Sequence, residues 1–250
     1  MYSPQKKRES RKKTMFDQQE FKNSCIKYFN KYKLECGGQI IKKFYHLANH
    51  LVCENQKYNL TAISDQNGII IKHFVDSAIV LNHINFPGNA GIIDIGAGAG
   101  FPSLPIALLR GDLKISCLDS SAKKINFIKT AADMLELKNL DFFCGRAEES
   151  NRRGFYDYAV SRAAARLNIL CELSAHSLKP GGVLCAYKSK GAAGELEACG
   201  NAFEILGLEL VKTVKFELEG EERAFVIIKK TGATPKEYPR HFSRILKNPL

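Results

Sequence analysis

The stretch that decides the fold runs from Asp94 to Pro102 and reads Asp-Ile-Gly-Ala-Gly-Ala-Gly-Phe-Pro. It ends a short apolar run that begins at Ile92, and a second apolar stretch with helical spacing begins at Leu104. Glycines at such a strand-to-helix turn let a ligand approach the backbone, because glycine has no side chain and tolerates left-handed conformations. The pattern therefore predicts a nucleotide-type binding turn, and the alternative is a glycine-rich turn without a ligand.

The chain on the carboxyl side of this turn alternates between strand-like and helix-like patterns. Apolar runs predict strands at 92–95, 113–118, 140–144, 156–160 and 183–187. Helical spacing predicts helices at 104–109, 123–135, 167–178 and 195–206, with a tight turn at 179–182. Two further strands, 208–218 and 223–229, are expected to form an antiparallel hairpin. This order predicts an α/β fold with a mostly parallel, Rossmann-like sheet of seven strands and an antiparallel edge.

The chain on the amino side of the turn predicts helices only. Apolar residues recur at steps of three and four between residues 15 and 86, ahead of the break Phe86-Pro87-Gly88-Asn89. We therefore expect four parts: a disordered basic tail at 1–14, a helical region at 15–86, the binding domain at 87–230, and a largely unstructured basic tail with prolines at 231–250.

The positive charge lies mainly at the two ends of the chain. The formal net charge is +11, and six Lys or Arg residues fall in 1–14 and six more in 229–250, against one Glu in each. Basic tails of this kind bind phosphate backbones or simply improve solubility. Two such ends on one chain favour an RNA partner.

The glycine spacing and its flanking acids favour S-adenosylmethionine as the cofactor. Gly96, Gly98 and Gly100 form a GxGxG pattern, whereas dinucleotide sites use GxGxxG. Asp94 suits the ammonium group of a cofactor that has an amino-acid part. Asp119 ends the second expected strand, where a carboxylate can accept hydrogen bonds from ribose hydroxyls.

Two later strand ends carry further candidates. Arg146, Ala147 and Glu148 follow the third strand and border the expected base pocket, although both charged side chains could simply be solvated. Arg162 follows the fourth strand and faces the crevice in which ligands of such sheets bind. It could bind a carboxylate of the cofactor or the substrate, and the alternative is a salt bridge to a neighbouring Asp.

Three other residues have both a functional and a structural interpretation. His73 and Asp76 lie three apart on one helical face, so we expect a mutual hydrogen bond that fixes the helical region against the cofactor domain. A catalytic pair is the alternative. Phe101 is expected to pack beside the methionine chain of the cofactor, or to be an ordinary core residue.

Several classes of protein and site are not expected. The longest apolar runs are too short to span a bilayer, which takes roughly 18 residues, and no apolar segment follows the basic N-terminus as in a secretory signal. The eight cysteines form no CxxC pair, which favours free thiols in a reducing cytoplasm and no metal site.

The ordered set of motifs resembles the bacterial glucose-inhibited division protein B family, also called ribosomal small-subunit methyltransferase G. The glycine loop and the Arg-Ala-Glu and Ser-Arg-Ala strand ends carry this resemblance. The other matching segments are 55–61 (NQKYNLT), 73–77 (HFVDS), 118–120 (LDS) and 234–240 (TPKEYPR). Together they span roughly residues 21–240.

The resemblance implies a class I methyltransferase fold and S-adenosylmethionine-dependent methylation of N7 of one guanosine in small-subunit (16S) ribosomal RNA. It implies that Gly96, Phe101, Ala147, Glu148 and Arg162 hold the cofactor. It also implies that the target lies in the assembled or assembling small subunit. We expect the protein to be cytoplasmic and a monomer.

Methylation of N7 fits the residues at hand. Guanine N7 carries a lone pair and no proton, so no catalytic residue in the strict sense is expected, and alignment supplies most of the catalysis. Arg162 or Lys188 could orient guanine through O6 or a phosphate, although Lys188 could also be a solvated lysine. The alternatives are a small-molecule methyltransferase, a non-catalytic RNA-binding ribosome-assembly factor and, more distantly, a dehydrogenase.

Overall fold

The computed structural model describes residues 15–250, so the expectation for the tail at 1–14 lies outside the described residues. The first part of the described chain is helical, as predicted. Two long helices are followed by a nearly continuous run of short helical segments. Their bounds are α1 Gln18–Lys31, α2 Gly38–Tyr58, α3 Gln66–Gly68, a π-helix Ile69–Val75, α4 Asp76–Ala78 and a 3-10 helix Ile79–Asn82.

The N-terminal helices are stabilised by the apolar spacing that predicted them. In α1, Phe21, Cys25 and Phe29 recur every fourth residue and are buried, because that spacing places them on one helical face. Asp17 caps the helix by accepting a hydrogen bond from the N–H of Glu20 at 2.8 Å. The same core cluster contains residues of α2 and of the helices after β1 and β2, so the helical region packs directly on the sheet domain.

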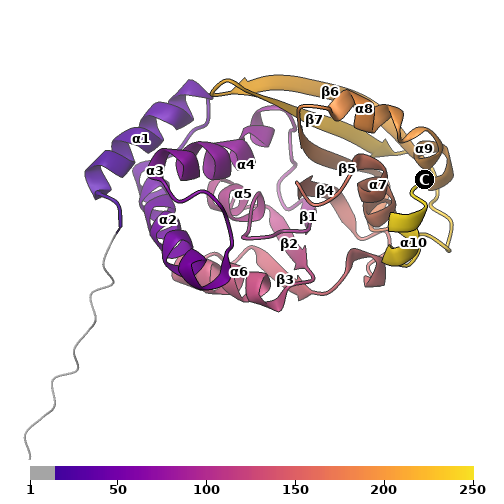
Figure 1. The fold of residues 1–250 in the computed structure, drawn as a ribbon, viewed down its shortest axis with the longest axis horizontal. Coiled ribbons are helices and arrows are strands. Elements are labelled where there is room, and N and C mark those ends of the chain that lie inside the picture. Colours follow the sequence, from indigo (N-terminus) through magenta and orange to yellow (C-terminus); the bar gives the residue numbers. More distant parts are fainter. Residues whose placement is uncertain (1–14) are drawn as a thin grey trace, which may run out of the picture.

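A seven-stranded sheet forms the centre of the molecule (Figure 1). The strands are β1 Gly91–Ile95, β2 Lys114–Asp119, β3 Leu140–Cys144, β4 Tyr156–Arg162, β5 Leu178–Ser189, β6 Leu208–Leu218 and β7 Glu221–Lys230. Their order is β3-β2-β1-β4-β5-β7-β6. The first five strands pair in parallel, and β7 pairs antiparallel with both β5 and β6. This is the predicted sheet with its antiparallel edge.

Helices cover both faces of the sheet. The helices α5 Ser103–Leu109 and α6 Ala122–Met134 pack on one face beside α2, whereas α7 Leu167–Ala175, α8 Ala192–Glu197 and α9 Gly200–Leu206 belong to the other. Adjacent strand residues therefore enter different cores. Ile92 of β1 lies in the cluster with α5, and Ile93 lies in the cluster with α7.

The largest differences from the predicted boundaries lie in two regions, the start of β5 and the helix after it. Helix α7 ends at Ala175, and β5 already begins at Leu178, so the expected turn at 179–182 lies within a strand that is irregular at its start. The predicted helix 195–206 is two helices, because α8 ends at Glu197 and α9 begins at Gly200.

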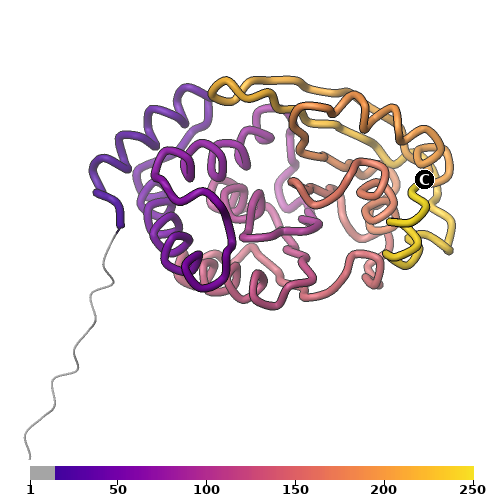
Figure 2. The backbone as a smooth tube through the Cα atoms, in the orientation of Figure 1, coloured from indigo at the N-terminus to yellow at the C-terminus, as the bar shows by residue number. Residues whose placement is uncertain are grey.

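The expectation of a largely unstructured C-terminal tail is wrong. A helix, α10 Phe242–Lys247, folds back on α7, and its Ile245 is fully buried. The yellow end of the tube in Figure 2 lies against the body of the molecule. Local composition suggested disorder here because the residues that anchor this segment lie far away in the sequence.

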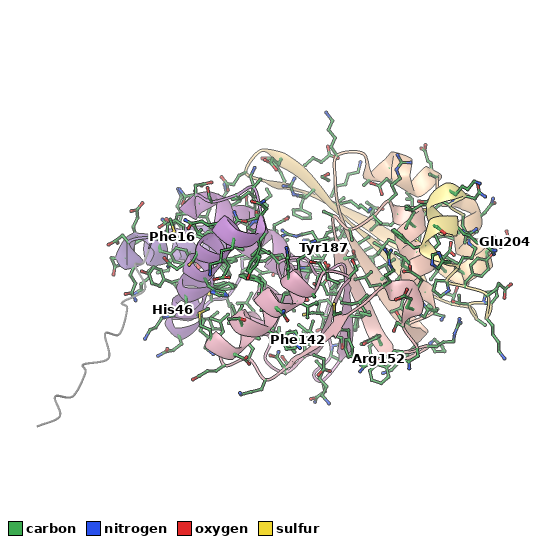
Figure 3. The ribbon with its side chains drawn as sticks, turned by 60° about the horizontal axis from the view of Figure 1, so that its bottom comes forward. Phe16, His46, Phe142, Arg152, Tyr187 and Glu204 are labelled. Carbon is green, nitrogen blue, oxygen red and sulfur yellow. The ribbon has the colours of Figure 1, made fainter. Side chains whose placement is uncertain are left out.

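The hairpin of β6 and β7 reaches over to the N-terminal helices. Glu219, at its tip, accepts hydrogen bonds from Lys31 at 2.5 Å and from the hydroxyl of Tyr32 at 2.9 Å. Near the middle of the molecule, the buried hydroxyl of Tyr187 on β5 donates to the main-chain oxygen of Ser77 at 2.8 Å (Figure 3). The sheet and the N-terminal helices are thus joined at the edge and in the interior.

Candidate cofactor and substrate site

The candidate site lies where the direction of strand succession reverses. Strands β1 and β4 are neighbours, and the chain continues from them toward opposite edges of the sheet. A crevice forms at the carboxyl ends of such a strand pair, and ligands of α/β sheets bind there. The loops that follow β1 and β4 contribute Gly96, Gly98 and residues 163–165 to its lining.

Two hollows meet at these loops. The first, here called the Asp119 hollow, has a volume of about 390 Å³ and is lined by the ends of β2 and β3 and by α7. The second, the Asp76 hollow, has a volume of about 790 Å³ and lies between the N-terminal helices, β5 and β7. Because Gly96, Gly98 and Arg162 line both hollows, a ligand lying across the loops would reach from one hollow into the other.

Asp119 lies in the first hollow with both carboxylate oxygens partly occupied. One oxygen accepts the N–H of Gly98 at 3.0 Å, and the other accepts the N–H of Ser121 at 2.9 Å. Lys124 lies 3.7 Å away. Since a carboxylate offers about four lone-pair sites, Asp119 keeps acceptor capacity for hydroxyl groups of a ligand.

The three glycines of the loop are glycine for two different reasons. A Cβ at Gly96 would lie 2.6 Å from the Cβ of Ala164, and one at Gly100 would lie 2.5 Å from Leu104, so packing within the protein excludes a side chain there. A Cβ at Gly98 would meet no atom closer than 3.9 Å. Gly98 alone therefore keeps space open at the junction of the two hollows.

Asp94 is completely buried beneath the loop and is not among the residues that line either hollow. One of its oxygens accepts the hydroxyl of Ser103 at 2.5 Å, and the other has no hydrogen-bond partner among the described residues. Burial raises the pKa of Asp94 to about 7. A nearby cation would lower that pKa. Asp94 therefore suits the expected ammonium group electrostatically, although its carboxylate lies beneath the loop and does not line either hollow.

Ala147 and Glu148 lie in the Asp119 hollow. Ala147 is buried, and the side chain of Glu148 is 5% exposed, which rules out the alternative of a solvated Glu148. A buried Glu148 oxygen has no hydrogen-bond partner among the described residues, and its nearest cation, Arg146, is 4.0 Å away. A buried acceptor without a partner is costly, which indicates that a ligand donor belongs beside it.

Arg162 is held by the N-terminal helical region. Its guanidinium donates to the main-chain oxygen of Lys72 at 2.7 Å and to the carboxylate of Asp76 at 3.0 Å. It also lies 5.4 Å from the ring centre of Phe101. The salt bridge to an Asp, the alternative interpretation from the sequence, is thus present, and Arg162 nevertheless lines both hollows.

The expected hydrogen bond between His73 and Asp76 is wrong. His73 Nε2 contacts the hydroxyl of Thr61 at 2.8 Å, and its Nδ1 faces Arg162 at 3.3 Å. Because arginine can only donate, Nδ1 accepts and the proton resides on Nε2. The helix directs both side chains to Arg162 instead of to each other. Burial, with help from Arg162, lowers the pKa of His73 to about 3, so the ring is neutral.

Phe101 and Lys188 line the Asp76 hollow from different elements. The Phe101 ring stacks on His73 with 4.5 Å between ring centres, so it is part of the core and also faces the hollow. Lys188 on β5 is not solvated: its ammonium bonds Glu195 at 2.7 Å and the main-chain oxygen of Ala165 at 2.8 Å. It therefore fixes the loop after β4.

Glu221, Arg223 and Phe242 are among the residues of these hollows that sequence reasoning missed. Arg223 lies 3.4 Å from Asp76 and bonds Glu221 at 2.6 Å, and Glu221 in turn bonds Lys72 at 2.5 Å. This alternating charge network joins the hairpin, β4 and the N-terminal helices at the wall of the Asp76 hollow. No local motif indicated it, because the pairs that join the elements, Arg223 with Asp76 and Glu221 with Lys72, are far apart in the sequence.

The donor set fits S-adenosylmethionine better than a metal ion. Asp119 offers oxygen acceptors, Glu148 offers a buried acceptor without a partner, and Gly98 leaves the passage open. In residues 15–250, no group of three His, Cys, Asp or Glu side chains is placed to hold a metal ion. None of the helices in this range combines the length and apolar character that crossing a membrane requires.

Comparisons with known proteins point the same way. A family model described as rRNA small subunit methyltransferase G matches residues 40–226. The chain is 39% identical over 225 residues to ribosomal RNA small subunit methyltransferase G of Lactococcus lactis subsp. lactis, covering 88% of this chain and 94% of that protein. The protein of the same name from Oceanobacillus iheyensis is 40% identical over 215 residues, covering 84% of this chain and 90% of that protein.

Solved structures share the fold at low sequence identity. TYW2 of M. jannaschii, in complex with AdoMet, superposes with a TM-score of 0.53 at 14% identity over 67% of this chain and 78% of that chain. The [4+2]-cyclase SpnF superposes with a TM-score of 0.52 at 15% identity over 64% of this chain and 80% of that chain. Since one is named a cyclase, this fold alone does not determine the reaction.

Proposed function

The chain belongs to the ribosomal RNA small subunit methyltransferase G family, and we propose that it transfers a methyl group from S-adenosylmethionine to N7 of a guanosine in small-subunit (16S) ribosomal RNA. The observation that carries this proposal is the pair of hollows that meet at Gly98. One hollow offers carboxylates for a nucleoside cofactor, and the other is large enough for a purine and has both basic and acidic side chains in its lining.

The Asp119 hollow is the proposed cofactor side. Asp119 would accept the ribose hydroxyls, while Ala147 and Glu148 would border the adenine. Gly96 and Gly100 allow the close packing of the loop, Gly98 leaves the passage between the hollows open, and Asp94 supplies negative charge beneath the loop. When bound, S-adenosylmethionine supplies a methyl group that its sulfonium already activates.

The Asp76 hollow is the proposed substrate side. Arg162 lines both hollows and is fixed by Asp76 and by the main chain of Lys72, so its guanidinium points in a defined direction. Phe101 contributes an apolar wall there. A fixed donor at the junction would orient guanine through O6, and accurate orientation is what methyl transfer to a lone pair needs most.

The protonation states suit a reaction that removes no proton before methyl transfer. His73, whose pKa is lowered to about 3, is a weak proton acceptor at neutral pH. Its ring is occupied by Thr61 and Arg162, so it acts by positioning Arg162. Guanine N7 carries a lone pair, and no general base is required.

The RNA is expected to be recognised in the context of the small ribosomal subunit, assembled or assembling, by a monomer in the cytoplasm of a bacterium. The basic ends of the chain support an RNA partner, because lysine and arginine release counterions from phosphates on binding. A small-molecule methyltransferase would not need them.

The test is methyl transfer in vitro to small subunits and to bare 16S RNA from cells that lack this gene. We expect radiolabelled methyl groups in RNA and 7-methylguanosine on mass spectrometry of the nucleosides. Cofactor binding without transfer to either RNA would instead indicate a small-molecule methyltransferase or a non-catalytic assembly factor. A different methylated nucleoside would contradict the N7 assignment alone.

A further inference from the structure

The last residues of the chain are fixed to the body of the protein by main-chain contacts. Arg153, in the turn before β4, donates to the main-chain oxygens of Thr234 at 3.0 Å and Tyr238 at 2.5 Å. Residues 232–250, here called the C-terminal segment, therefore follow a defined path across the end of the sheet. In Figure 1 this segment lies beside α7.

A buried ion pair anchors the middle of the C-terminal segment. Glu172 on α7 is completely buried, and its carboxylate accepts the main-chain N–H of Arg240 at 2.9 Å. The Arg240 guanidinium donates to both carboxylate oxygens, at 2.8 and 2.6 Å. Such a two-pronged contact fixes direction as well as distance.

The end of the segment is anchored as well. Ile245 of α10 is fully buried in the core that contains α7, and the amide of Asn168 donates to the main-chain oxygen of Leu250 at 3.2 Å. Phe242 thus lies between two fixed points, Arg240 and Ile245, and its position is defined by the protein itself.

Phe242 lines the Asp119 hollow. It shares this lining with Asp119, Ala147 and Glu148, and among the described residues that line the hollow it is the one aromatic side chain. The guanidinium of Arg146 lies 5.4 Å from the centre of the Phe242 ring, which completes the wall on that side. The ring is only half-buried, so part of its surface is free to contact a ligand.

We propose that the C-terminal segment is a wall of the cofactor site and that Phe242 is a further cofactor-binding residue, which contacts the adenine of S-adenosylmethionine. This proposal rests on the proposed function, because it takes the Asp119 hollow to hold the nucleoside. Aromatic rings contact purines favourably whatever the detailed hydrogen bonding, and the loss of such a contact weakens binding by about five- to a hundredfold.

The test is calorimetric titration of the full-length protein with S-adenosylmethionine and, separately, with adenosine. Phe242→Ala should weaken both ligands by a similar factor of about ten, because the lost contact is to the nucleoside that they share. Phe242→Tyr should bind both nearly as well as the unchanged protein. Leu246→Ala is the matched control, since Leu246 lies on the same helix, is 55% exposed and lines neither hollow.

The outcomes separate this proposal from the proposed function. If the unchanged protein binds S-adenosylmethionine and Phe242→Ala binds it equally well, the proposal is wrong and the proposed function stands. If the unchanged protein binds neither ligand, both are wrong. Should Phe242→Ala fail to fold, Phe242→Leu retains apolar volume without the ring, and unaltered affinity for adenosine in that variant would overturn the proposal.

Discussion

At the scale of single residues, the loop after β1 requires glycine for two different reasons. Gly96 and Gly100 are required because a side chain would collide with Ala164 or Leu104, whereas Gly98 has open space around its Cα. All three also have positive φ angles, which other residues adopt only at a cost. Substitution at Gly98 should therefore affect ligand binding far more than folding.

We expect Gly98→Glu to abolish binding of S-adenosylmethionine and to leave the protein folded. The new side chain would fill the junction of the two hollows and place a negative charge beside Asp119. Gly154→Glu is the matched control, since the φ angle of Gly154 is +63° against +60° at Gly98 and nothing lies within 4 Å of its Cβ position. Calorimetry measures affinity, and thermal unfolding measures stability. Unaltered affinity in Gly98→Glu would refute the expectation.

Asp94 illustrates a different constraint, that of a buried carboxyl group with only one partner. Burial raises its pKa from 3.8 to about 7, so the folded protein holds a proton that the unfolded chain releases between these values. Stability therefore falls as pH rises from about 4 to 7, because the folded state must either keep the proton or bury a charge.

We expect Asp94→Asn to remove this pH dependence. Without cofactor, the melting temperature of the variant should rise relative to that of the unchanged protein as pH increases from 4 to 7, because asparagine is neutral throughout this range. The measurement is thermal unfolding of both proteins across that range. Two parallel curves would mean that Asp94 titrates near its ordinary value in the folded protein.

At the scale of elements, the C-terminal segment depends on one buried carboxylate. Arg240→Leu would leave Glu172 buried without its partner, and we expect the free energy of unfolding to fall by about 3 kcal/mol. Urea unfolding measures this. The double variant Glu172→Leu with Arg240→Leu should recover most of the loss, because no unpaired charge then remains.

Arg244→Leu provides the control for Arg240→Leu, because Arg244 is exposed on the same segment. We expect its stability to change little. A loss in Arg244→Leu as large as that in Arg240→Leu would show that the effect comes from altered net charge and not from the pair with Glu172.

The elements that could be predicted from the sequence are those whose cause is local. Continuous apolar runs predicted the strands, apolar residues at steps of three and four predicted the helices, and the glycine loop located the site at the end of β1. The anchors of the C-terminal segment were hidden, because Arg240 and Glu172 are 68 residues apart. Proline and basic residues alone made that segment resemble a disordered tail.

The residues of the candidate site that could be predicted are likewise those whose position follows from a local pattern. Asp119, Ala147 and Glu148 stand at strand ends, so the topology brings them to one hollow. The sequence offered a salt bridge between Arg162 and an Asp as an alternative, but it did not identify Asp76, which reaches Arg162 only through the packing of the N-terminal helices. The bond expected between His73 and Asp76 was wrong because helical spacing shows which residues share a face and not what lies opposite that face.

At the scale of the whole molecule, positive charge is concentrated at the chain ends, and RNA is the expected partner. We expect deletion of residues 1–14 to weaken binding to small-subunit RNA and to make it less sensitive to salt, because fewer counterions are released. Binding of S-adenosylmethionine should not change. A full-length variant with the six basic residues of this stretch replaced by glutamine should behave like the deletion.

The measurement is RNA affinity over a range of salt concentrations. With up to six cations removed, the slope of log affinity against log salt should fall by as much as about 5. An identical slope for the deletion and the unchanged protein would indicate that this end of the chain does not touch the phosphates.

The tip contact of Glu219 with Lys31 and Tyr32 has a consequence for biosynthesis. During translation the first helices emerge early, but the strands that close the large hollow over them are among the last to be made, and Phe242 follows later still. A nascent chain halted before the hairpin would lack part of the wall of the Asp76 hollow. Such a product would lack Phe216, Glu221 and Arg223, which line the Asp76 hollow, so we expect it not to bind the substrate.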